Sequence, residues 1–445
     1  MKLGNLRPVG RLYVSGVLLL HLLVVWNARD LILKGYPDFT IYYTAGTMVR
    51  QGMGHTLYDD SVQFQVQRTF APQVATRLGA LPFNHPPFEA VLFVPLAYFP
   101  YRVAYLLWGL ANLAMLVALP LLLRPHVPIL RNWPAPPWTV TVVSLAFFPI
   151  FFALLQGQDA ILLLFLYGLA FVSWKQKRLV SAGAWLACGM FKFHLVLPFL
   201  LLILIQEKTA QASKRIFAGF LAVSVVLAAV SVAAVGTQQI LSYPRYVLGL
   251  EKTMAMGAIM PSDMPNLRGV LYLMASNALS KTRYFDILVI FVSGVLYLVA
   301  AGIFALPGRD RDTDPSHADP SYADPSFADP SFADRSQADQ RDLKFSLAVF
   351  ATVLVSYHGL GYDLCVLALP ALLLVGQLGK KIIAASWTGA AICAGLAVLL
   401  FSPLQLVLLM RYNRLALLGW ALLLCFAGLA GVVLAGEFRL RFLRA

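Results

Sequence analysis

The chain has 445 residues, of which 59% are hydrophobic and 13% are charged, whereas a soluble domain carries about 25% charged residues. Its net charge of +14 would suggest a nucleic-acid partner in a soluble protein, but in a membrane protein it reflects basic cytoplasmic loops that set topology and contact anionic membrane lipids. We therefore exclude a soluble dehydrogenase, a nucleic-acid binder and a single-pass receptor, and we expect an all-α polytopic membrane protein.

The N-terminal segment predicts the orientation of the chain. Lys2, Arg7 and Arg11 precede the first apolar run without an acidic residue, which places this end in the cytoplasm by the positive-inside rule. Residues 12–33 form the first predicted span. The polar stretch 34–85 then lies on the outer side of the membrane as the first outer loop.

The remaining apolar runs predict further membrane helices, since a spanning helix needs about 20 apolar residues. They lie at about 87–100, 102–123, 138–155, 160–174, 179–191, 194–205, 216–236, 285–306, 344–358, 363–378, 383–401 and 412–435. The basic clusters that mark the cytoplasmic side lie at 175–178, 208–215, 309–311, 380–381 and 439–444. An odd number of runs cannot join two cytoplasmic ends, so we expect the short, proline-interrupted run 87–100 to be broken or re-entrant. About 12 crossings result.

Two of these runs, 179–191 and 194–205, are too short for a full span. Shortened helices that meet at a polar turn enclose a cavity within the membrane, which puts Lys192 and His194 at the apex of the pair, near the outer face. The segment 237–284 forms a second outer loop. The whole chain, 1–445, is predicted to be a single polytopic membrane domain.

A five-residue repeat occupies residues 314–338, with the units DPSHA, DPSYA, DPSFA, DPSFA and DRSQA. A unit so short and so rich in Pro, Asp and Ser lacks the continuous apolar face needed to build a core. We predict a disordered cytoplasmic loop over residues 308–343.

Ionisable residues inside or beside apolar runs are costly and therefore indicate function. In this chain they are Asp38, His85, Glu89, Asp159, Lys192, His194, Asp263, Arg268, His358 and Asp363. On the predicted topology most of them converge on the outer side, whereas structural anchors would be scattered over both interfaces.

Asp38 begins the segment DFTIYYTAG just after the first span. An aspartate at this boundary, followed by Tyr42 and Tyr43, has the position of a general base toward a hydroxyl. An alternative is an interfacial cap, with Asp38 at a helix N-terminus and the tyrosines in an aromatic belt. Position alone leaves both interpretations open.

Several motifs follow one another in a characteristic order. They are DFTIYYTAG at 38–46, LYD at 57–59, NHPPFEAVLFVPLAYFP from Asn84, LLQGQDAILLL, FKFH at 191–194 and MPNLRG at 264–269. In this order they resemble the polyprenol-phosphate-mannose-dependent glycosyltransferases of family 87, within the GT-C superfamily. The resemblance covers most of residues 30–375. One departure is Phe193, which stands after Lys192 where the commoner pattern has proline.

The resemblance implies a GT-C-type fold with about 12 transmembrane helices, a partly helical first outer loop and an active site that faces the periplasm or cell exterior. Members of the family transfer a sugar from a polyprenyl-phosphate donor to a hydroxyl of a lipid or glycan acceptor. The superfamily's catalytic acid maps onto Asp38. No cofactor and no divalent cation are expected, because the leaving group is already an anionic phosphate.

Such a transfer needs a base for the acceptor hydroxyl and cations for the departing phosphate. Asp38 fits the base in a reaction that inverts the anomeric centre. For donor-phosphate binding, the candidates are Lys192, His194, His358 and Arg268. Each has a structural alternative, since Lys192 could snorkel to the interface, His358 could be a satisfied interfacial histidine, and Arg268 could anchor a helix end.

A further set is predicted to bind the sugar or the acceptor: Tyr42, Tyr43, His85, Glu89, Gln158 and Asn266. Gln158 follows Gly157, so the pair could equally form a tight turn. A metal site is not expected, because Asp59 and Asp60 are adjacent in the chain and no further ligand lies at metal-binding spacing.

We therefore predict a hexosyltransferase, with mannose as the sugar, in a bacterial inner membrane. One alternative is a polytopic lipid or glycan transporter or flippase, which would show repeated halves that this sequence lacks. Another is a membrane acyltransferase in which His358 would be the base.

Overall fold

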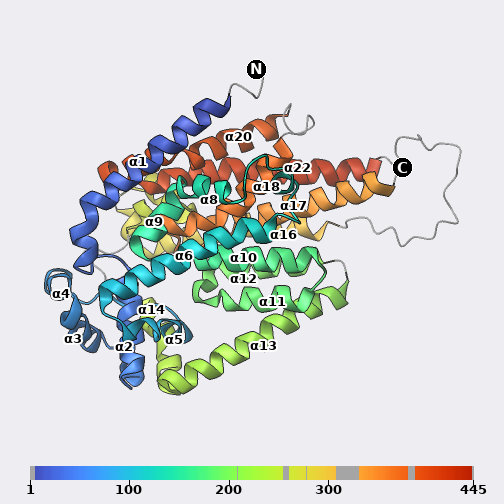
Figure 1. Ribbon diagram of the computed structural model, residues 1–445. Helices are drawn as coiled ribbons and strands as arrows, with labels where there is room; N and C mark the ends of the chain where they lie inside the picture. The colour runs from blue at the N-terminus through green and yellow to red at the C-terminus, as the bar shows by residue number, and fades with distance from the viewer. Residues whose placement is uncertain are drawn as a thin grey trace, which may run out of the picture.

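The computed structural model describes residues 6–207, 209–253, 260–276, 278–306, 330–378 and 386–442. Within these ranges every regular element is a helix (Figure 1). This agrees with the all-α class predicted from the composition.

Five helices are long and apolar enough to cross a membrane. They are α1 (Leu6–Leu33), α6 (Tyr101–Leu123), α13 (Ala210–Val235), α16 (Arg283–Ala305) and α22 (Leu418–Phe442). Three bent helix pairs raise the number to eight if each pair is one span. They are α8 (Trp138–Leu145) with α9 (Phe148–Gln156), α11 (Leu179–Cys188) with α12 (Phe193–Gln206), and α20 (Trp387–Leu400) with α21 (Ser402–Val407).

The described residues therefore form a polytopic membrane protein, but twelve crossings are not confirmed. The difference arises because an apolar run need not be one straight helix. The run 87–100, which the twelve already excluded as broken, contains only the short helix α5 (Pro87–Phe93) and a turn of 3-10 helix at Leu96–Tyr98, too short to cross the hydrocarbon core. The runs 179–191 and 194–205, counted as two crossings, form one bent helix pair. Two other runs give the short helices α10 (Ala160–Lys175) and α18 (Ala368–Leu378).

The predicted apex at Lys192 is present as a bend of 63° between α11 and α12. A turn of 3-10 helix at Met190–Lys192 connects the two helices. The neighbouring α11 and α13 approach closely because Gly183 and Gly219 face the backbone of the other helix, where a Cβ atom would clash with Ile216 O and Val180 O. Small residues at such a contact are typical of membrane helix pairs.

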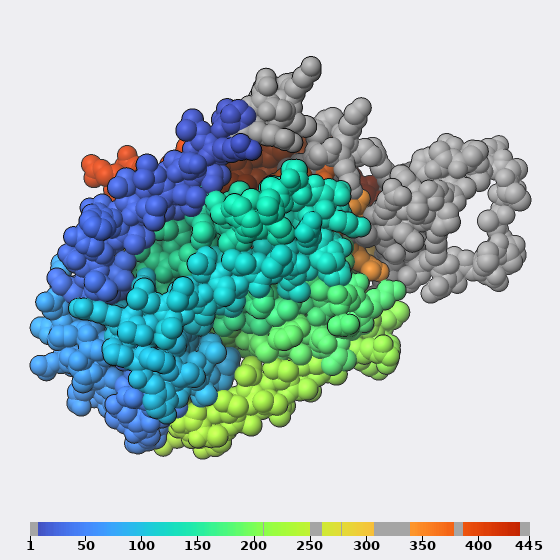
Figure 2. Space-filling view, in the orientation of Figure 1, coloured from blue at the N-terminus to red at the C-terminus, as the bar shows by residue number. Residues whose placement is uncertain are grey.

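The helices form a layered bundle in which α6, α10, α11 and α13 lie side by side (Figure 1). On the other side, α17 (Pro330–Val355) packs against α12, α16 and α22. Figure 2 shows α1 in blue along one edge of the surface and α13 in yellow-green along another. Their outward side chains, such as Leu19 and Val225, are apolar and exposed, as expected of lipid-facing helices.

The two predicted outer loops fold into short helices. The first contains α2 (Phe39–Arg50), a 3-10 turn at Gly54–Thr56, α3 (Asp60–Phe70) and α4 (Pro72–Leu78). The second contains α14 (Thr237–Thr253), α15 (Leu267–Met274) and 3-10 turns at Pro261–Asp263 and Leu279–Lys281. Buried aromatic residues, with Phe39, Tyr42 and Phe93 at the centre, form a separate core that holds α2 against α5 and α6.

Much of the loop predicted over 308–343, and the basic clusters at 309–311 and 380–381, lie outside the described residues. The helix α17 begins at Pro330, inside the predicted loop, so the last repeat units are helical. Proline is favoured in the first turn of a helix, and the Ala, Arg, Gln and Leu residues that follow are good helix formers. The remaining elements are α7 (Pro128–Arg131), a 3-10 helix at Gly361–Leu367, a π-helix at Leu408–Tyr412 and a 3-10 turn at Leu415–Leu417.

Candidate active site

Asp38 stands at the N-cap position of α2, but its side chain makes no capping hydrogen bond. Its Oδ2 instead accepts a hydrogen bond of 2.6 Å from Gln158 Nε2, and its backbone N donates to Gln156 Oε1 over 3.2 Å. The side chain is partly exposed. The carboxylate is therefore oriented by a polar side chain from another helix, which disfavours the interpretation of Asp38 as a helix cap.

Gln158 reaches Asp38 because the chain turns sharply at Gly157. Gly157 ends α9 in the left-handed region with φ of 63°, and a Cβ atom there would lie 2.7 Å from Phe39 Cβ. Only glycine adopts this conformation at such a contact without strain. Gln158 is buried, and its Oε1 accepts a 2.7 Å hydrogen bond from the Tyr42 hydroxyl. The structure therefore shows the tight turn at Gly157, and both polar atoms of the Gln158 amide bond protein groups, Asp38 and Tyr42.

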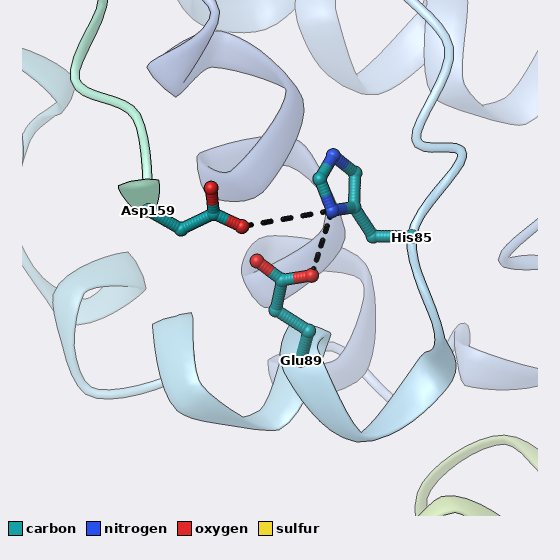
Figure 3. Close-up of side chains that lie close together, drawn as sticks. All are labelled: His85, Glu89 and Asp159. Atoms are coloured by element: carbon teal, nitrogen blue, oxygen red, sulfur yellow. Dashed lines mark ion pairs between the residues drawn. The ribbon is translucent and has the colours of Figure 1, made fainter. Parts of the chain in front are cut away.

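Next to Tyr42 lies a cluster of His85, Glu89 and Asp159 (Figure 3). His85 Nδ1 is 2.8 Å from Glu89 Oε2 and 3.8 Å from Asp159 Oδ2, and His85 Nε2 is 3.5 Å from the Tyr42 hydroxyl. Pro87 begins α5, so Glu89 lies in the first helical turn, four residues after His85. Asp159 comes from the loop between α9 and α10.

Lys192 extends the cluster to the C-terminal half of the chain. Its Nζ is 3.0 Å from Asp159 Oδ1 and 2.9 Å from Asp363 Oδ1, and the residue is only 3% exposed. Asp363 Oδ2 in turn accepts a 2.8 Å hydrogen bond from Leu360 N. Lys192 therefore points into the protein between two carboxylates, which disfavours the alternative that it snorkels to an interface.

Burial and neighbouring charges shift the protonation of this network in opposite directions. Burial raises the pKa of Asp38, against the lowering effect of Gln158 and Lys192. Burial also raises the pKa of Glu89, and Asp159 adds to that rise. At His85 burial alone would lower the pKa, but Glu89 and Asp159 raise it above its ordinary value. At Asp159 burial is outweighed by Lys192 and His85, so its pKa is lowered. A proton is therefore favoured between His85 and Glu89, whereas Asp159 stays ionised.

Three predicted phosphate ligands lie on neighbouring segments. His194, on α12, has an Nε2 atom that is buried without a hydrogen-bond partner among the described residues. Arg268 stacks on the ring of Tyr357 at 4.0 Å and donates a long hydrogen bond of 3.4 Å to Tyr357 O. His358 follows Tyr357 and is partly exposed. Arg268 and His358 thus belong to one local site, joined by Tyr357.

Two other predicted residues have structural contacts that lead away from the cluster. Asn266 Oδ1 caps α15 by accepting from Gly269 N over 2.9 Å, and its Nδ2 donates to Ser356 O over 2.7 Å. The Tyr43 hydroxyl donates to Phe99 O over 2.9 Å, whereas the Tyr42 hydroxyl donates to Gln158. The contacts of Asn266 and Tyr43 account for both side chains without a ligand.

The sequence assigned no role to Asp159, Asp363, Gln156 or Tyr58, although the structure places all four at or beside the cluster. In the sequence, Asp159 and Asp363 stood out only as ionisable residues inside or beside apolar runs. A usable signal for Gln156 was its position in the segment QGQD, where three polar residues surround one glycine between apolar runs. The Tyr58 hydroxyl donates to His85 O over 2.8 Å, a contact that no local pattern indicates.

The cluster also has the residue types of a metal site. One ligand atom from each of His85, Glu89 and Asp159 lies within 4.8 Å of the others. Histidine and carboxylate ligands suit zinc, iron or manganese. However, Asp159 also contacts the Lys192 ammonium and His85 contacts Glu89 directly, so ion pairs already engage the groups that would bind a metal.

Comparison with known proteins identifies the family. The family model described as Glycosyltransferase family 87 matches residues 83–318, more than half of the chain. The chain belongs to glycosyltransferase family 87. This confirms the resemblance found in the sequence motifs. No curated protein and no solved structure matches the chain.

The family 87 match includes most of the cluster but not all of it. His85, Glu89, Asp159 and Lys192 lie inside the matched range, whereas Asp38 precedes it. Membership of a glycosyltransferase family favours a transferase over the transporter and acyltransferase alternatives. The hydrogen bond from Gln158 to Asp38 joins the matched region to the first outer loop.

Proposed function

We propose that this family 87 protein transfers a sugar, specifically mannose, from a polyprenyl-phosphate donor to a hydroxyl of a lipid or glycan acceptor. The reaction takes place at the outer face of a bacterial inner membrane, on the periplasmic side, in a GT-C-type fold with about 12 crossings. Asp38 acts as the general base, and the anomeric centre is inverted.

The observation that carries this proposal is the state of the Asp38 carboxylate. It stands at the start of a helix yet caps nothing, it is partly exposed, and Gln158 Nε2 fixes one of its oxygens. A general base must reach the proton it removes while its own orientation is held. Of the carboxyl groups in the cluster, Glu89, Asp159 and Asp363 are buried, so Asp38 is the one that an entering hydroxyl can reach.

In the proposed reaction the acceptor oxygen attacks C1 of the sugar on the face opposite the phosphate. The bond between C1 and the phosphate oxygen breaks, and its electron pair leaves with the polyprenyl phosphate. Asp38 takes the proton from the acceptor hydroxyl as the new glycosidic bond forms. Gln158 holds the Asp38 carboxylate in place, and the Tyr42 hydroxyl holds Gln158. His85 Nε2 lies within 3.5 Å of that hydroxyl.

The departing phosphate needs positive charge in a site that is rich in carboxyl groups. Lys192 is already shared by Asp159 and Asp363, so in this proposal it fixes those two carboxylates and contributes long-range positive charge. Direct contact falls to Arg268 and His358, with the buried Nε2 of His194 as a hydrogen-bond partner. A cation aimed at charge that develops in the transition state is strongly stabilising in a low-dielectric site.

The proposal is tested by reconstituting the purified protein in liposomes with β-linked polyprenyl phosphate [¹⁴C]mannose and a membrane extract as the source of acceptor. The label should move to a product that resists the mild acid that cleaves the donor, and the new linkage should be α. Label that crosses the bilayer without a glycosidic product would instead support a transporter. Transfer that required a nucleotide sugar would contradict the proposed donor.

A further inference from the structure

An open cleft lies between the first outer loop and α14. Its volume is about 440 Å³, and its lining includes Thr56, Tyr58, Gln239, Ser242, Arg245 and Tyr246. This volume is within the range of about 300–1,000 Å³ typical of small-molecule sites. The lining combines hydroxyl, amide and guanidinium groups with two aromatic rings. It can therefore both donate and accept hydrogen bonds.

Hydrogen bonds between the two loops fix the walls of this cleft. The Tyr246 hydroxyl donates to Asp60 Oδ1 over 2.6 Å, and Gln239 Nε2 donates to His55 O. The rings of Tyr58 and Tyr246 lie 5.0 Å apart at an interplanar angle of 36°. The cleft is thus a preformed feature with an aromatic wall, which reduces the ordering that a ligand would otherwise require.

One cation in the cleft is not committed to the fold. Arg245 is exposed, and among the described residues it makes no hydrogen bond or ion pair. Asp59, which also lines the cleft, caps α3 through Ser61 N and Val62 N, and Asp60 accepts from Tyr246, each with its Oδ1. Arg245 therefore offers its donors to a ligand.

The cleft adjoins the catalytic cluster through Tyr58. The ring of Tyr58 forms part of the cleft wall, while its hydroxyl donates to the backbone O of His85. From His85 the contacts continue to Tyr42 and Gln158, and then to Asp38. A ligand held in the cleft is thus separated from the cluster by Tyr58 and the segment around His85.

We propose that this cleft is the acceptor site and that it binds a carbohydrate, a sugar unit next to the one that receives the transferred residue. Sugars present many hydroxyls together with an apolar face, which matches a lining of amide, hydroxyl and guanidinium groups beside tyrosine rings. This inference rests on the proposed function, since it assigns the acceptor of the same reaction. The carbohydrate can be the head group of a glycolipid or part of a free glycan.

The test is a steric block with a matched control on the same helix. Ser242→Trp fills the cleft, because Ser242 lines it and its hydroxyl bonds only within α14, to Gln239 O. Leu241→Trp adds bulk at the adjacent residue, which is 78% exposed and does not line the cleft. Arg245→Ala removes the uncommitted cation and leaves every described contact of the fold intact.

Transfer is measured in two separate experiments, one with an organic-soluble glycolipid extract of the source cells as the acceptor and one with a delipidated glycan extract. The experiment that gives product identifies whether the acceptor carbohydrate belongs to a glycolipid or to a free glycan. In that experiment Ser242→Trp should raise the half-saturating acceptor concentration about tenfold or more because the indole occupies the cleft, and Arg245→Ala should do so because a charged hydrogen-bond donor is lost. Half-saturation by the donor should not change. Leu241→Trp should behave as the wild type in both respects.

The outcomes separate the two proposals. If both cleft variants keep the wild-type acceptor dependence, the cleft is not the acceptor site, and the proposed function still stands. If the wild type gives no glycosidic product in either experiment, the proposed function itself fails. If Ser242→Trp lowers the melting temperature, Arg245→Ala decides, since Arg245 has no structural partner to lose.

Discussion

The hydrogen bond between Gln158 and Asp38 leads to a quantitative prediction about the pH dependence of transfer. Gln158→Leu removes the Nε2 donor that lies 2.6 Å from Asp38 Oδ2, and this donor lowers the pKa of Asp38 against the effect of burial. A hydrogen bond to a charged group is worth about 1.5–3 kcal/mol, and one pKa unit corresponds to about 1.36 kcal/mol. The charged form of Asp38 should therefore lose stabilisation of this order, and its pKa should rise.

The sign of the effect on rate follows from the role of Asp38. A general base works only when it is deprotonated, so the rate falls as the pH drops through its pKa. In Gln158→Leu this acidic limb should move to higher pH, and the rate should recover toward the wild type at alkaline pH. The assay is the pH profile of kcat with saturating donor and acceptor.

The neighbouring glutamine supplies a control for this measurement. Gln156 contacts the backbone N of Asp38 and not its carboxylate, so Gln156→Leu should leave the acidic limb where it is in the wild type. A limb that does not move in Gln158→Leu, or that moves equally in both variants, would refute the assignment of Asp38 as the titrating base.

Three further predictions concern the same site. Lys192→Met leaves the buried carboxylates of Asp159 and Asp363 without their cation and should lower the free energy of unfolding in detergent by about 3–5 kcal/mol. Adding Asp363→Asn to Lys192→Met should restore part of this loss. If the effects of the two substitutions on the free energy of unfolding simply add, the ion-pair network is contradicted. Gly157→Ala should destabilise the protein and slow transfer, because the new Cβ meets Phe39. Gly52→Ala, at a comparable φ of 76° with open space around it, should cost only the backbone strain of about 1–3 kcal/mol. Equal melting temperatures and transfer rates in these two variants would count against the role of the turn at Gly157. Transfer should survive exhaustive treatment with EDTA, and activity that was lost and then restored by Mg²⁺ or Mn²⁺ would instead place a cation at His85, Glu89 and Asp159.

The sequence predicted the membrane class and the bend at Lys192 because both follow from local composition, whereas the helices within residues 34–85 were expected from the family resemblance. Apolar runs reveal helices, and a lysine between two short runs reveals where they meet. The number of crossings was harder to predict, since the runs 160–174 and 363–378 give only the short helices α10 and α18. The point at which a helix ends inside an apolar run depends on packing against other helices, which hydropathy does not record.

The candidate site was predicted as a set of charges but not as a network. Asp38 and Gln158 are 120 residues apart in the chain, and Lys192 and Asp363, which form an ion pair, are even further apart in the chain. Pairings at such separations are fixed by the tertiary fold and leave no periodic signal in one sequence. For the same reason Lys192 was expected at a phosphate, whereas its charge is already shared by two carboxylates.

The central claim is that Asp38 is the base of a sugar transfer from a polyprenyl-phosphate donor, and one substitution tests it most directly. Asp38→Asn keeps the size of the side chain and an oxygen that can accept from Gln158, so fold and donor binding should be retained. The single-turnover rate of mannose transfer should then fall by about 10²–10⁴-fold, whereas Asp30→Asn, an exposed aspartate on α1, should transfer at the wild-type rate. Transfer by Asp38→Asn at the wild-type rate would contradict the proposed mechanism.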